Sequence, residues 1–364
     1  MKYRFDKIAF NSTAKKTPTE SDKEHYIGLE HIDGECLEIT RWGSDVAPIG
    51  EKLIMKKGDV LFGKRRAYQR KLAIAPFDGI FSAHGMVLRP NEEVVDKNYF
   101  PFFMSSDLFM ERAVQISVGG LSPTINWKDL REQEFPLPSL AEQKVLADKL
   151  WAAYRLKESY KKLLLTTEEM VKSQFIEMFG NPVTNNKGWN TLPIKDVAPE
   201  TSSLEKQTGK VWILNLDMIE SNTGKVVEKV FENDSNLLSV APFDEGNVLY
   251  SKLRPYLNKV VIPDGKGYAT TELVPLRPNQ KLLNLTFFSH LLRGDDFVTY
   301  ANSISTGTKM PRMPLNDLRK FQCILPPMEK QNEFEEIAHQ ADKSGFELRK
   351  SIESIDKVIK SLIN

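Results

Sequence analysis

The chain has 364 residues, of which 41% are hydrophobic and 27% are charged, and its 50 basic residues nearly balance its 49 acidic ones. This composition excludes a disordered chain and a wholly basic nucleic-acid coat, so any nucleic-acid surface must be a local patch. Only two cysteines, Cys36 and Cys323, are present, which excludes a disulfide framework and a cysteine-rich zinc site. The sequence has no apolar run long enough to span a membrane and no apolar stretch in residues 1–16, so we expect no membrane contact, no signal peptide and a cytoplasmic protein.

The first part of the chain, residues 1–138, predicts a mixed α/β module. Short apolar runs bounded by glycine and proline predict strands, among them 60–62 and 72–74. Residues 97–114 predict a helix. Residues 139–180 then predict one long helix, which we expect to act as a spacer.

Both ends of this helix have clear signals. Ser139 is an N-cap residue with Glu142 three positions on, which is a capping box. The helix is expected over 140–179, about 40 residues or roughly 60 Å. Gly180 ends it, because glycine adopts the left-handed conformation of a helix C-cap.

The second part of the chain repeats this plan. Residues 181–326 predict a second α/β module, with a strand at 259–262 and a helix at 285–301, and residues 327–364 predict a second long helix. Apolar or small residues in that helix alternate at spacings of four and three, which is a heptad seam. The seam comprises Phe334, Ala338, Ala341, Gly345, Leu348, Ile352, Ile355, Ile359 and Leu362.

The two halves are copies of each other. Residues 58–62 match 246–250, and residues 88–91 match 276–279, both at an offset of 188 residues. A period of this length indicates a duplicated domain rather than a solenoid repeat. The same offset carries the heptad seam onto the first long helix, at Leu146, Leu150, Ala153, Lys157, Tyr160, Leu164, Thr167, Val171 and Gln174.

The fold class predicted from these patterns is α+β, with two repeated α/β modules joined by two long helices. One helix alone cannot bury a heptad seam, so we expect the two helices to pair as an antiparallel coiled coil. The alternative is that each helix packs only on its own module.

A basic loop that contains an aromatic residue occurs at the same place in both copies. Such a loop suits contact with a phosphate backbone and the bases beside it, and arginine can read guanine in the major groove. A solvated hairpin is the alternative, but its recurrence in a nearly neutral protein favours nucleic acid. The candidate residues are Lys64, Arg65, Arg66, Tyr68, Arg70 and Lys71 in the first copy, and Lys252, Arg254, Tyr256 and Lys259 in the second.

A second matched loop, rich in glycine and hydroxyl residues, spans 117–124 in the first copy and 305–312 in the second. Such loops commonly hold phosphates through backbone N–H groups, although a simple turn is the alternative. The candidate residues here are Ser122, Thr124, Thr308, Lys309 and Arg312.

Motifs of catalysis are missing from the sequence. The five histidines have no metal-ligand spacing, and there is no phosphate loop, dinucleotide fingerprint or nucleophile elbow. Asn181-Pro182-Val183 lacks the second proline and the aromatic residue of the adenine-methyltransferase motif. We therefore expect no catalytic residue, metal or cofactor on this chain.

Two α/β modules, each followed by a long helix that starts with Leu-Pro and a glutamine five residues beyond the proline, resemble the specificity subunit of type I restriction-modification systems. The resemblance covers nearly the whole chain. It is carried by residues 135–143 and their repeat 324–331, by residues 172–180 at the end of the first long helix, and by residues 304–308. Two departures are Glu329-Lys330-Gln331 in place of Ala-Glu-Gln, and Val118-Gly119-Gly120 where the family often has Gly-Thr.

This resemblance implies that each module is a target-recognition domain for one half of a split site in double-stranded DNA. The long helices would set the gap between the halves and dock two modification subunits, which would bind S-adenosylmethionine and methylate a flipped adenine. Restriction subunits would add ATP- and Mg-dependent translocation and cleavage in host defence. The two modules differ in sequence, so the target should be asymmetric.

Two other functions remain open from the sequence. One is a DNA-modifying or DNA-cleaving enzyme with a fused specificity region, which would modify or cut DNA without partner subunits. The other is a coiled-coil scaffold that binds partner proteins and no DNA. DNA binding with and without modification subunits would separate them.

Overall fold

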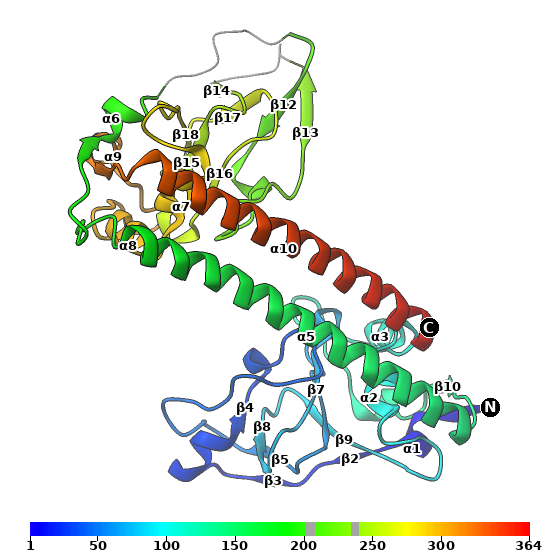
Figure 1. The fold of residues 1–364 in the computed structure, drawn as a ribbon. Coiled ribbons are helices and arrows are strands. Elements are labelled where there is room, and N and C mark those ends of the chain that lie inside the picture. Colours follow the sequence, from blue (N-terminus) through cyan, green and yellow to red (C-terminus); the bar gives the residue numbers. More distant parts are fainter. Residues whose placement is uncertain (201–207, 234–239) are drawn as a thin grey trace. The chain divides into compact units, whose positions relative to one another are not determined.

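The computed structural model describes residues 1–200, 208–233 and 240–364, and the chain divides into two compact units (Figure 1). Unit 1 contains Met1–Lys161 and Lys350–Asn364, and unit 2 contains Lys162–Arg349. Each unit therefore holds one α/β module, the first half of the long helix that follows it, and the second half of the other long helix.

The strands of unit 1 are β1 (Lys2–Arg4), β2 (Ala9–Ser12), β3 (Lys15–Lys16), β4 (Tyr26–Ile27), β5 (Lys52–Met55), β6 (Val60–Phe62), β7 (Leu72–Ile74), β8 (Gly79–Phe81), β9 (Met86–Pro90) and β10 (Glu134–Pro136). They form an antiparallel sheet of order β2-β9-β6-β7, a mixed sheet of order β3-β5-β8-β4 in which β4 and β8 are parallel, and the pair β1-β10. The strands predicted at 60–62 and 72–74 are confirmed as β6 and β7.

Strand β6 of unit 1 is buried on both faces, which explains its continuous apolar sequence. Val60 and Phe62 of β6 point into a core that also contains helical residues, whereas Leu61 points into a second core between the sheets. Because successive side chains of a strand face opposite sides, a strand covered on both sides must be apolar throughout. The matching strand of unit 2 behaves in the same way, with Val248 and Tyr250 in one core and Leu249 in the other.

The short helices of unit 1 are α1 (Phe5–Ile8), α2 (Phe100–Ser105), α3 (Asp107–Gln115) and α4 (Trp127–Leu130). The helix predicted over 97–114 is thus two helices. Ser106 lies between them with an extended ψ of 153°, and its Oγ accepts a hydrogen bond from the Phe109 N–H at 3.2 Å. A serine at this position caps the second helix, and therefore breaks the first.

The strands of unit 2 are β11 (Thr191–Pro193), β12 (Lys210–Leu214), β13 (Val230–Asn233), β14 (Val240–Phe243), β15 (Val248–Ser251), β16 (Val260–Val261), β17 (Gly267–Thr270), β18 (Leu273–Leu276) and β19 (Gln322–Ile324). The sheet orders are β13-β12-β17-β14, β16-β15-β18 and β11-β19, and β12 is parallel to β17. The strand expected at 259–262 is the shorter β16.

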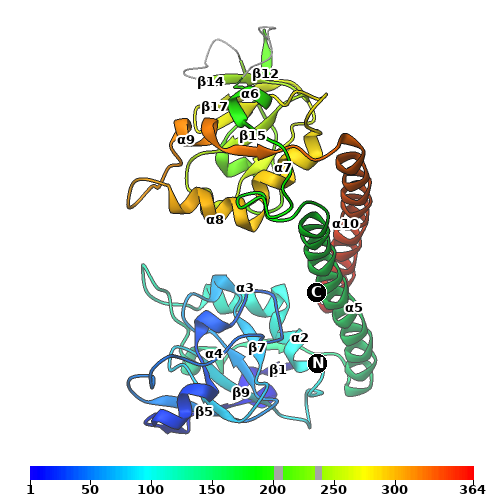
Figure 2. The same cartoon turned by 60° about the vertical axis from the view of Figure 1, so that its left-hand side comes forward.

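The helices of unit 2 are α6 (Ile194–Val197), α7 (Leu285–Arg293), α8 (Asp295–Ser303) and α9 (Leu315–Lys320). The helix predicted over 285–301 is again two helices, broken at Gly294, whose ψ is 144°. Within this unit, the sheet of β12 and β17 covers one face of β15, and α7 packs on the other face (Figure 2).

The two long helices, α5 (Leu140–Phe179) and α10 (Met328–Ile363), span both units. The predicted capping box at the start of α5 is confirmed: the Ser139 N–H donates to Glu142 Oε2 at 2.9 Å, and the Glu142 N–H donates to Ser139 Oγ at 3.3 Å. Gly180 follows α5 with a φ of +74°, as a helix-ending glycine should.

The helices pair along the predicted seam, with antiparallel direction. Every seam position predicted in both helices is buried or half-buried. In unit 1 the Lys157 ammonium forms an ion pair with Asp356, and in unit 2 Arg349 forms one with Glu168 at 2.8 Å. Within unit 2, Glu168 faces Arg349 and Phe175 packs on Phe334, so residue numbers rise on α5 as they fall on α10. The predicted antiparallel pairing is confirmed there.

A buried glutamine explains the repeated sequence at the start of each long helix. The side chain of Gln143 is fully buried, accepts from the Asp96 N–H at 2.8 Å, and donates to the carbonyls of Val94 and Pro138 at 3.1 and 3.0 Å. Its repeat, Gln331, is also fully buried and has the equivalent contacts, namely the Asn284 N–H at 2.9 Å, the Leu282 carbonyl at 3.0 Å and the Pro326 carbonyl at 2.8 Å. The glutamine fixes each helix to its module.

Replacing Gln331 with leucine should therefore destabilise the protein. Leucine has a similar size but leaves one N–H and two carbonyls without partners, and buried groups of this kind cost about 1–3 kcal/mol each when unsatisfied. We expect the free energy of unfolding, measured by chemical denaturation, to fall by about 2–4 kcal/mol. Gln340→Leu, at an exposed position of the same helix, is the control. A loss no larger than that of the control would show that the glutamine does not anchor the helix.

Candidate nucleic-acid interface

The two loops that the sequence singled out in each copy lie together in the structure. In unit 1 the Arg66 N–H donates to the Pro123 carbonyl at 2.7 Å, and the Ile125 N–H donates to the Lys64 carbonyl at 2.9 Å. We call residues 64–71 and 117–124 loop pair 1. The sequence alone predicted these loops separately and gave no sign that they are neighbours.

Unit 2 repeats this arrangement bond for bond. The Arg254 N–H donates to the Pro311 carbonyl at 2.7 Å, and the Met313 N–H donates to the Lys252 carbonyl at 2.9 Å. We call residues 252–259 and 305–312 loop pair 2. Each module thus presents one composite surface built from its basic loop and its glycine loop.

Each glycine loop is a small hairpin. In unit 1 the N–H and carbonyl groups of Val118 and Thr124 bond to each other at 3.0 and 2.9 Å, and Thr306 and Arg312 do so in unit 2. Gly119 has a φ of +115° and Gly307 a φ of +99°, values that only glycine adopts readily. The glycines therefore serve the turn, and the side chains around them remain available for contacts.

The basic loops hold non-glycine residues in the left-handed conformation at matching places. Arg66 has a φ of 57° and Arg254 a φ of 50°, each just before a short 3₁₀ turn (Ala67–Gln69 and Pro255–Leu257). Such a conformation is uncommon for a residue with a side chain, and glycine would adopt it without strain. Arginine nevertheless occupies both positions.

The aromatic and several basic side chains of the loop pairs reach solvent. Tyr68 is 55% exposed and Tyr256 is 51% exposed. Arg65 and Arg66 are exposed in loop pair 1, and Thr308, Lys309 and Arg312 in loop pair 2. Exposed aromatic rings beside cations suit stacking on bases and contact with phosphates.

Other predicted residues are engaged within the fold. Lys71 Nζ donates to the Leu29 carbonyl at 2.5 Å, and its repeat Lys259 donates to the Leu216 carbonyl at 2.6 Å. These matched bonds hold a neighbouring 3₁₀ turn in each module. The ammonium groups of Lys71 and Lys259 therefore have a structural role within their modules.

Two predicted arginines form ion pairs. Arg70 contacts Asp107 and Glu35; burial alone would lower its pKa, but these carboxylates raise it. Arg312 pairs with Glu272 at 2.9 Å, and the hydrogen bond raises the pKa of the arginine. Their charge is partly compensated, so they are weaker candidates for DNA contacts than Arg65 or Arg66.

The remaining candidates are half-buried. Burial, and then Lys15, lower the pKa of Lys64, while Lys252 lies at the matching place in unit 2. Ser122 and Thr124 are also half-buried, and Thr124 Oγ1 donates to the Ser122 carbonyl at 3.2 Å. These groups lie at the base of the loop pairs.

The two arginines at the left-handed positions differ in one contact. Arg66 Nε donates to Ser122 Oγ at 3.2 Å. Arg254 Nε is buried and has no partner among the described residues, because Met310 stands at the place of Ser122. The side chain of Arg254 is therefore held less firmly than that of Arg66.

Met310→Ser should supply the missing acceptor. A new hydrogen bond to a charged group contributes about 1.5–3 kcal/mol, offset by the lost contacts of a 45% exposed methionine. We expect the free energy of unfolding of unit 2 to rise by about 1 kcal/mol, as measured by thermal denaturation. The matched change Ser122→Met should lower the stability of unit 1. A destabilising effect of Met310→Ser would contradict this assignment.

The sequence reasoning missed the apolar tip of loop pair 1. Leu121 is 97% exposed and Val118 is 58% exposed, both in the glycine loop. Two exposed aliphatic residues beside a basic loop are suited to thymine methyl groups or sugar rings. The only available sign was an apolar pair in a loop otherwise composed of small residues.

No helix within the described residues is long and apolar enough to cross a membrane. The same residues contain no group of three or more histidine, cysteine, aspartate or glutamate side chains placed to hold a metal ion. The groups that the loop pairs present for contacts are hydrogen-bond donors, cations and aromatic rings.

Comparison with known proteins agrees with this picture. Residues 10–166 and 186–356 each match the family model of the type I restriction modification DNA specificity domain. The two matches cover most of the chain and correspond to its two copies.

Curated relatives span almost the same length. The specificity subunit of the type I restriction enzyme EcoDI from Escherichia coli is 23% identical to this chain, and the alignment covers 97% of this chain and 84% of that protein. The putative type I restriction enzyme MjaX specificity subunit from Methanocaldococcus jannaschii is 24% identical, with coverage of 92% and 84%. A solved structure of the S subunit of a type I restriction-modification system from M. genitalium has the same fold, with a TM-score of 0.59 at 13% identity over 100% of this chain and 94% of that chain.

Proposed function

Because this chain belongs to the type I restriction modification DNA specificity domain family, we propose that each of its two modules reads one half of a split site in double-stranded DNA. A specificity subunit is the non-catalytic member of its complex. In this role residues 1–138 and 181–326 are the recognition domains, and residues 139–180 and 327–364 are the helical spacer. The loop pairs are the DNA-contacting surfaces.

The observation that carries this proposal is the duplication of the loop pair. The same backbone bonds, left-handed arginine and exposed tyrosine occur in both modules, as expected if both touch the same kind of ligand. Arg66 and Arg254, with Lys64 and Lys252 beneath them, are suited to phosphates, which are alike in every sequence. In this proposal, the geometry that the two modules share positions each module on the DNA backbone.

The residues between these shared positions differ, and they are the candidates for base recognition. Arg65 in unit 1 corresponds to Leu253 in unit 2, and Gln69 corresponds to Leu257. Arginine and glutamine can form paired hydrogen bonds with guanine and adenine, whereas leucine offers only apolar contact. The two half-sites should therefore differ in sequence.

The partners follow from the same proposal. Two modification subunits would dock on the helices, bind S-adenosylmethionine and methylate adenine, and restriction subunits would supply ATP- and Mg-dependent cleavage. These cofactors belong to the partner subunits. Such a complex works on intracellular DNA, so we propose a cytoplasmic location.

Methylome sequencing of a host with and without this chain tests the proposal. We expect a split adenine motif to be methylated only when the chain and its modification subunits are present. An unchanged methylome with intact partners would contradict it. Methylation or cleavage by the chain alone would favour a fused enzyme, and binding of partners without any DNA shift would favour a DNA-free scaffold.

A further inference from the structure

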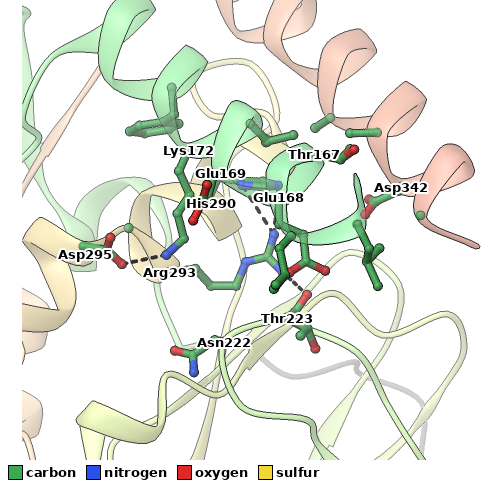
Figure 3. Close-up of a pocket in the computed structure, with 18 of the residues that line it drawn as sticks. Thr167, Glu168, Glu169, Lys172, Asn222, Thr223, His290, Arg293, Asp295 and Asp342 are labelled. Carbon is green, nitrogen blue, oxygen red and sulfur yellow. Dashed lines mark hydrogen bonds and ion pairs between the residues drawn. The ribbon is translucent and has the colours of Figure 1, made fainter. Parts of the chain in front are cut away.

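Unit 2 contains a cavity of about 630 Å³ between α5, α10, the start of α8 and residues 222–225 (Figure 3). Its apolar wall consists of residues from the helix pair, among them Val171, Phe175 and Ala338. On the opposite side His290, Arg293 and Thr223 face the cavity. A volume of this size is typical of sites for small organic ligands. The cavity lies outside loop pair 2.

Unit 1 has a pocket at the equivalent place, but it is almost filled and has a volume of about 70 Å³. Most of its lining residues correspond to residues of the larger cavity at the offset of 188. Tyr154 occupies this space in unit 1, and its hydroxyl accepts a hydrogen bond from the Leu37 N–H at 3.0 Å. Lys157 fills the adjoining space and pairs with Asp356.

Three substitutions between the copies open the cavity in unit 2. Asp342 replaces Tyr154, Gly345 replaces Lys157, and His290 replaces Phe102. Each change removes bulk or apolar character. Since unit 1 folds with the space filled, the fold does not require an opening here, and a void of this size sacrifices packing contacts.

A fourth substitution adds a buried cation. Arg293 stands at the place of Ser105, and its guanidinium donates to the Thr223 carbonyl and, at 2.8 Å, to His290 Nε2. Burial and the nearby Arg293 lower the pKa of His290, so the ring is neutral and accepts this bond. Among the described residues no carboxylate forms an ion pair with Arg293, and Glu168 and Asp295 pair with Arg349 and Lys172. Burial lowers the pKa of Arg293, while the more distant Asp342 and Glu168 act against this shift.

The backbone also makes room for this guanidinium. A Cβ atom on Gly224 would lie 2.1 Å from an Arg293 nitrogen, and the φ of Gly224 is +69°. Unit 1 has Cys36 at this position, opposite the small Ser105. In unit 2, the absence of a side chain at Gly224 therefore leaves the space that the Arg293 guanidinium occupies. A half-buried cation without a direct carboxylate partner among the described residues, next to an open cavity, suits an anion from outside.

We propose that this cavity binds a small organic anion with a ring-sized apolar body, whose carboxylate or phosphate group is held by Arg293. The apolar body lies against Val171, Phe175 and Ala338, in the space that the phenol ring of Tyr154 fills in unit 1. Lys225 lines the same cavity and adds a second cation. The exposed Asp342 is a carboxylate near the opening, so the site favours ligands whose charge reaches the deeper Arg293.

Calorimetric titration of the full chain with phenyl phosphate tests this proposal, with phenol and inorganic phosphate as partial probes. We expect one site per chain, with at least tenfold weaker binding of either partial probe. Arg293→Met should lower the affinity for phenyl phosphate at least tenfold and remove the preference over phenol. The control is Arg319→Met, since Arg319 pairs with Glu200 away from the cavity.

A second variant keeps the proposal testable if Arg293→Met fails to fold. Asp342→Tyr copies unit 1, leaves Arg293 in place and should weaken binding by placing a phenol ring in the space of the ligand's apolar body, while the melting temperature stays the same or rises. Equal binding of phenyl phosphate by wild type and both variants, or no binding by wild type, would overturn the proposal. Displacement of the probe by modification subunits would assign the cavity to a side chain of that partner instead of a free small molecule.

Discussion

Arg66→Ala and Arg254→Ala should each weaken binding of the assembled complex to its DNA site by about 1–3 kcal/mol, roughly tenfold to a hundredfold. Both arginines sit at the point where a basic loop meets a glycine loop, and both are held in the left-handed conformation. If they contact phosphates, the loss of affinity should be similar on all DNA sequences. The slope of log affinity against log salt concentration should then fall by the amount expected for about one phosphate contact. If they contact bases, discrimination at one position should relax.

Two controls separate this effect from an effect on folding. Arg41→Ala removes an exposed arginine of unit 1 that pairs with Asp33 and lies outside the loop pair. Arg66→Gly removes the side chain and also relieves the left-handed strain, so it should bind DNA as poorly as Arg66→Ala while being up to about 1 kcal/mol more stable. Unchanged affinity of folded Arg66→Ala and Arg254→Ala complexes would remove the loop pairs from the interface.

The features that could be predicted from the sequence are those set by local or periodic patterns. The heptad seam, the capping box at Ser139 and the stop at Gly180 depend on residues close together in the chain, and the structure confirms them. The duplicated order of elements followed from one constant offset. The breaks at Ser106 and Gly294 were missed, because a serine or glycine inside an apolar pattern does not by itself end a helix.

The features that could not be predicted depend on contacts between distant segments. The two loops of each pair were identified, but their junction rests on bonds between residues about 57 positions apart, such as Arg66 and Pro123. Lys71 and Lys259 carry the same charge as the other loop residues, and only the structure shows that carbonyls of a neighbouring turn engage them. The seam glycine at 345 gave no sign of the cavity it helps to open.

Lengthening both long helices by one heptad should widen the non-specific gap of the DNA site by about three base pairs. The insertions belong after Lys161 and after Arg349, where the two units meet in the sequence of each helix. The ion pairs Lys157–Asp356 and Glu168–Arg349 then stay intact, because each lies within one unit. Seven residues preserve the four-three spacing of the seam and add about 10 Å of helix, or about three steps of 3.4 Å along DNA.

The methylated motif of the heptad variant, read by sequencing, measures this directly. Both half-site sequences should stay the same while the gap grows, because the loop pairs are untouched. A two-residue insertion after Lys161 alone is the matched control; it rotates the following seam residues by about 200° and should abolish assembly. An active heptad variant with an unchanged gap would show that the helices do not set the spacing, even if they dock the partner subunits.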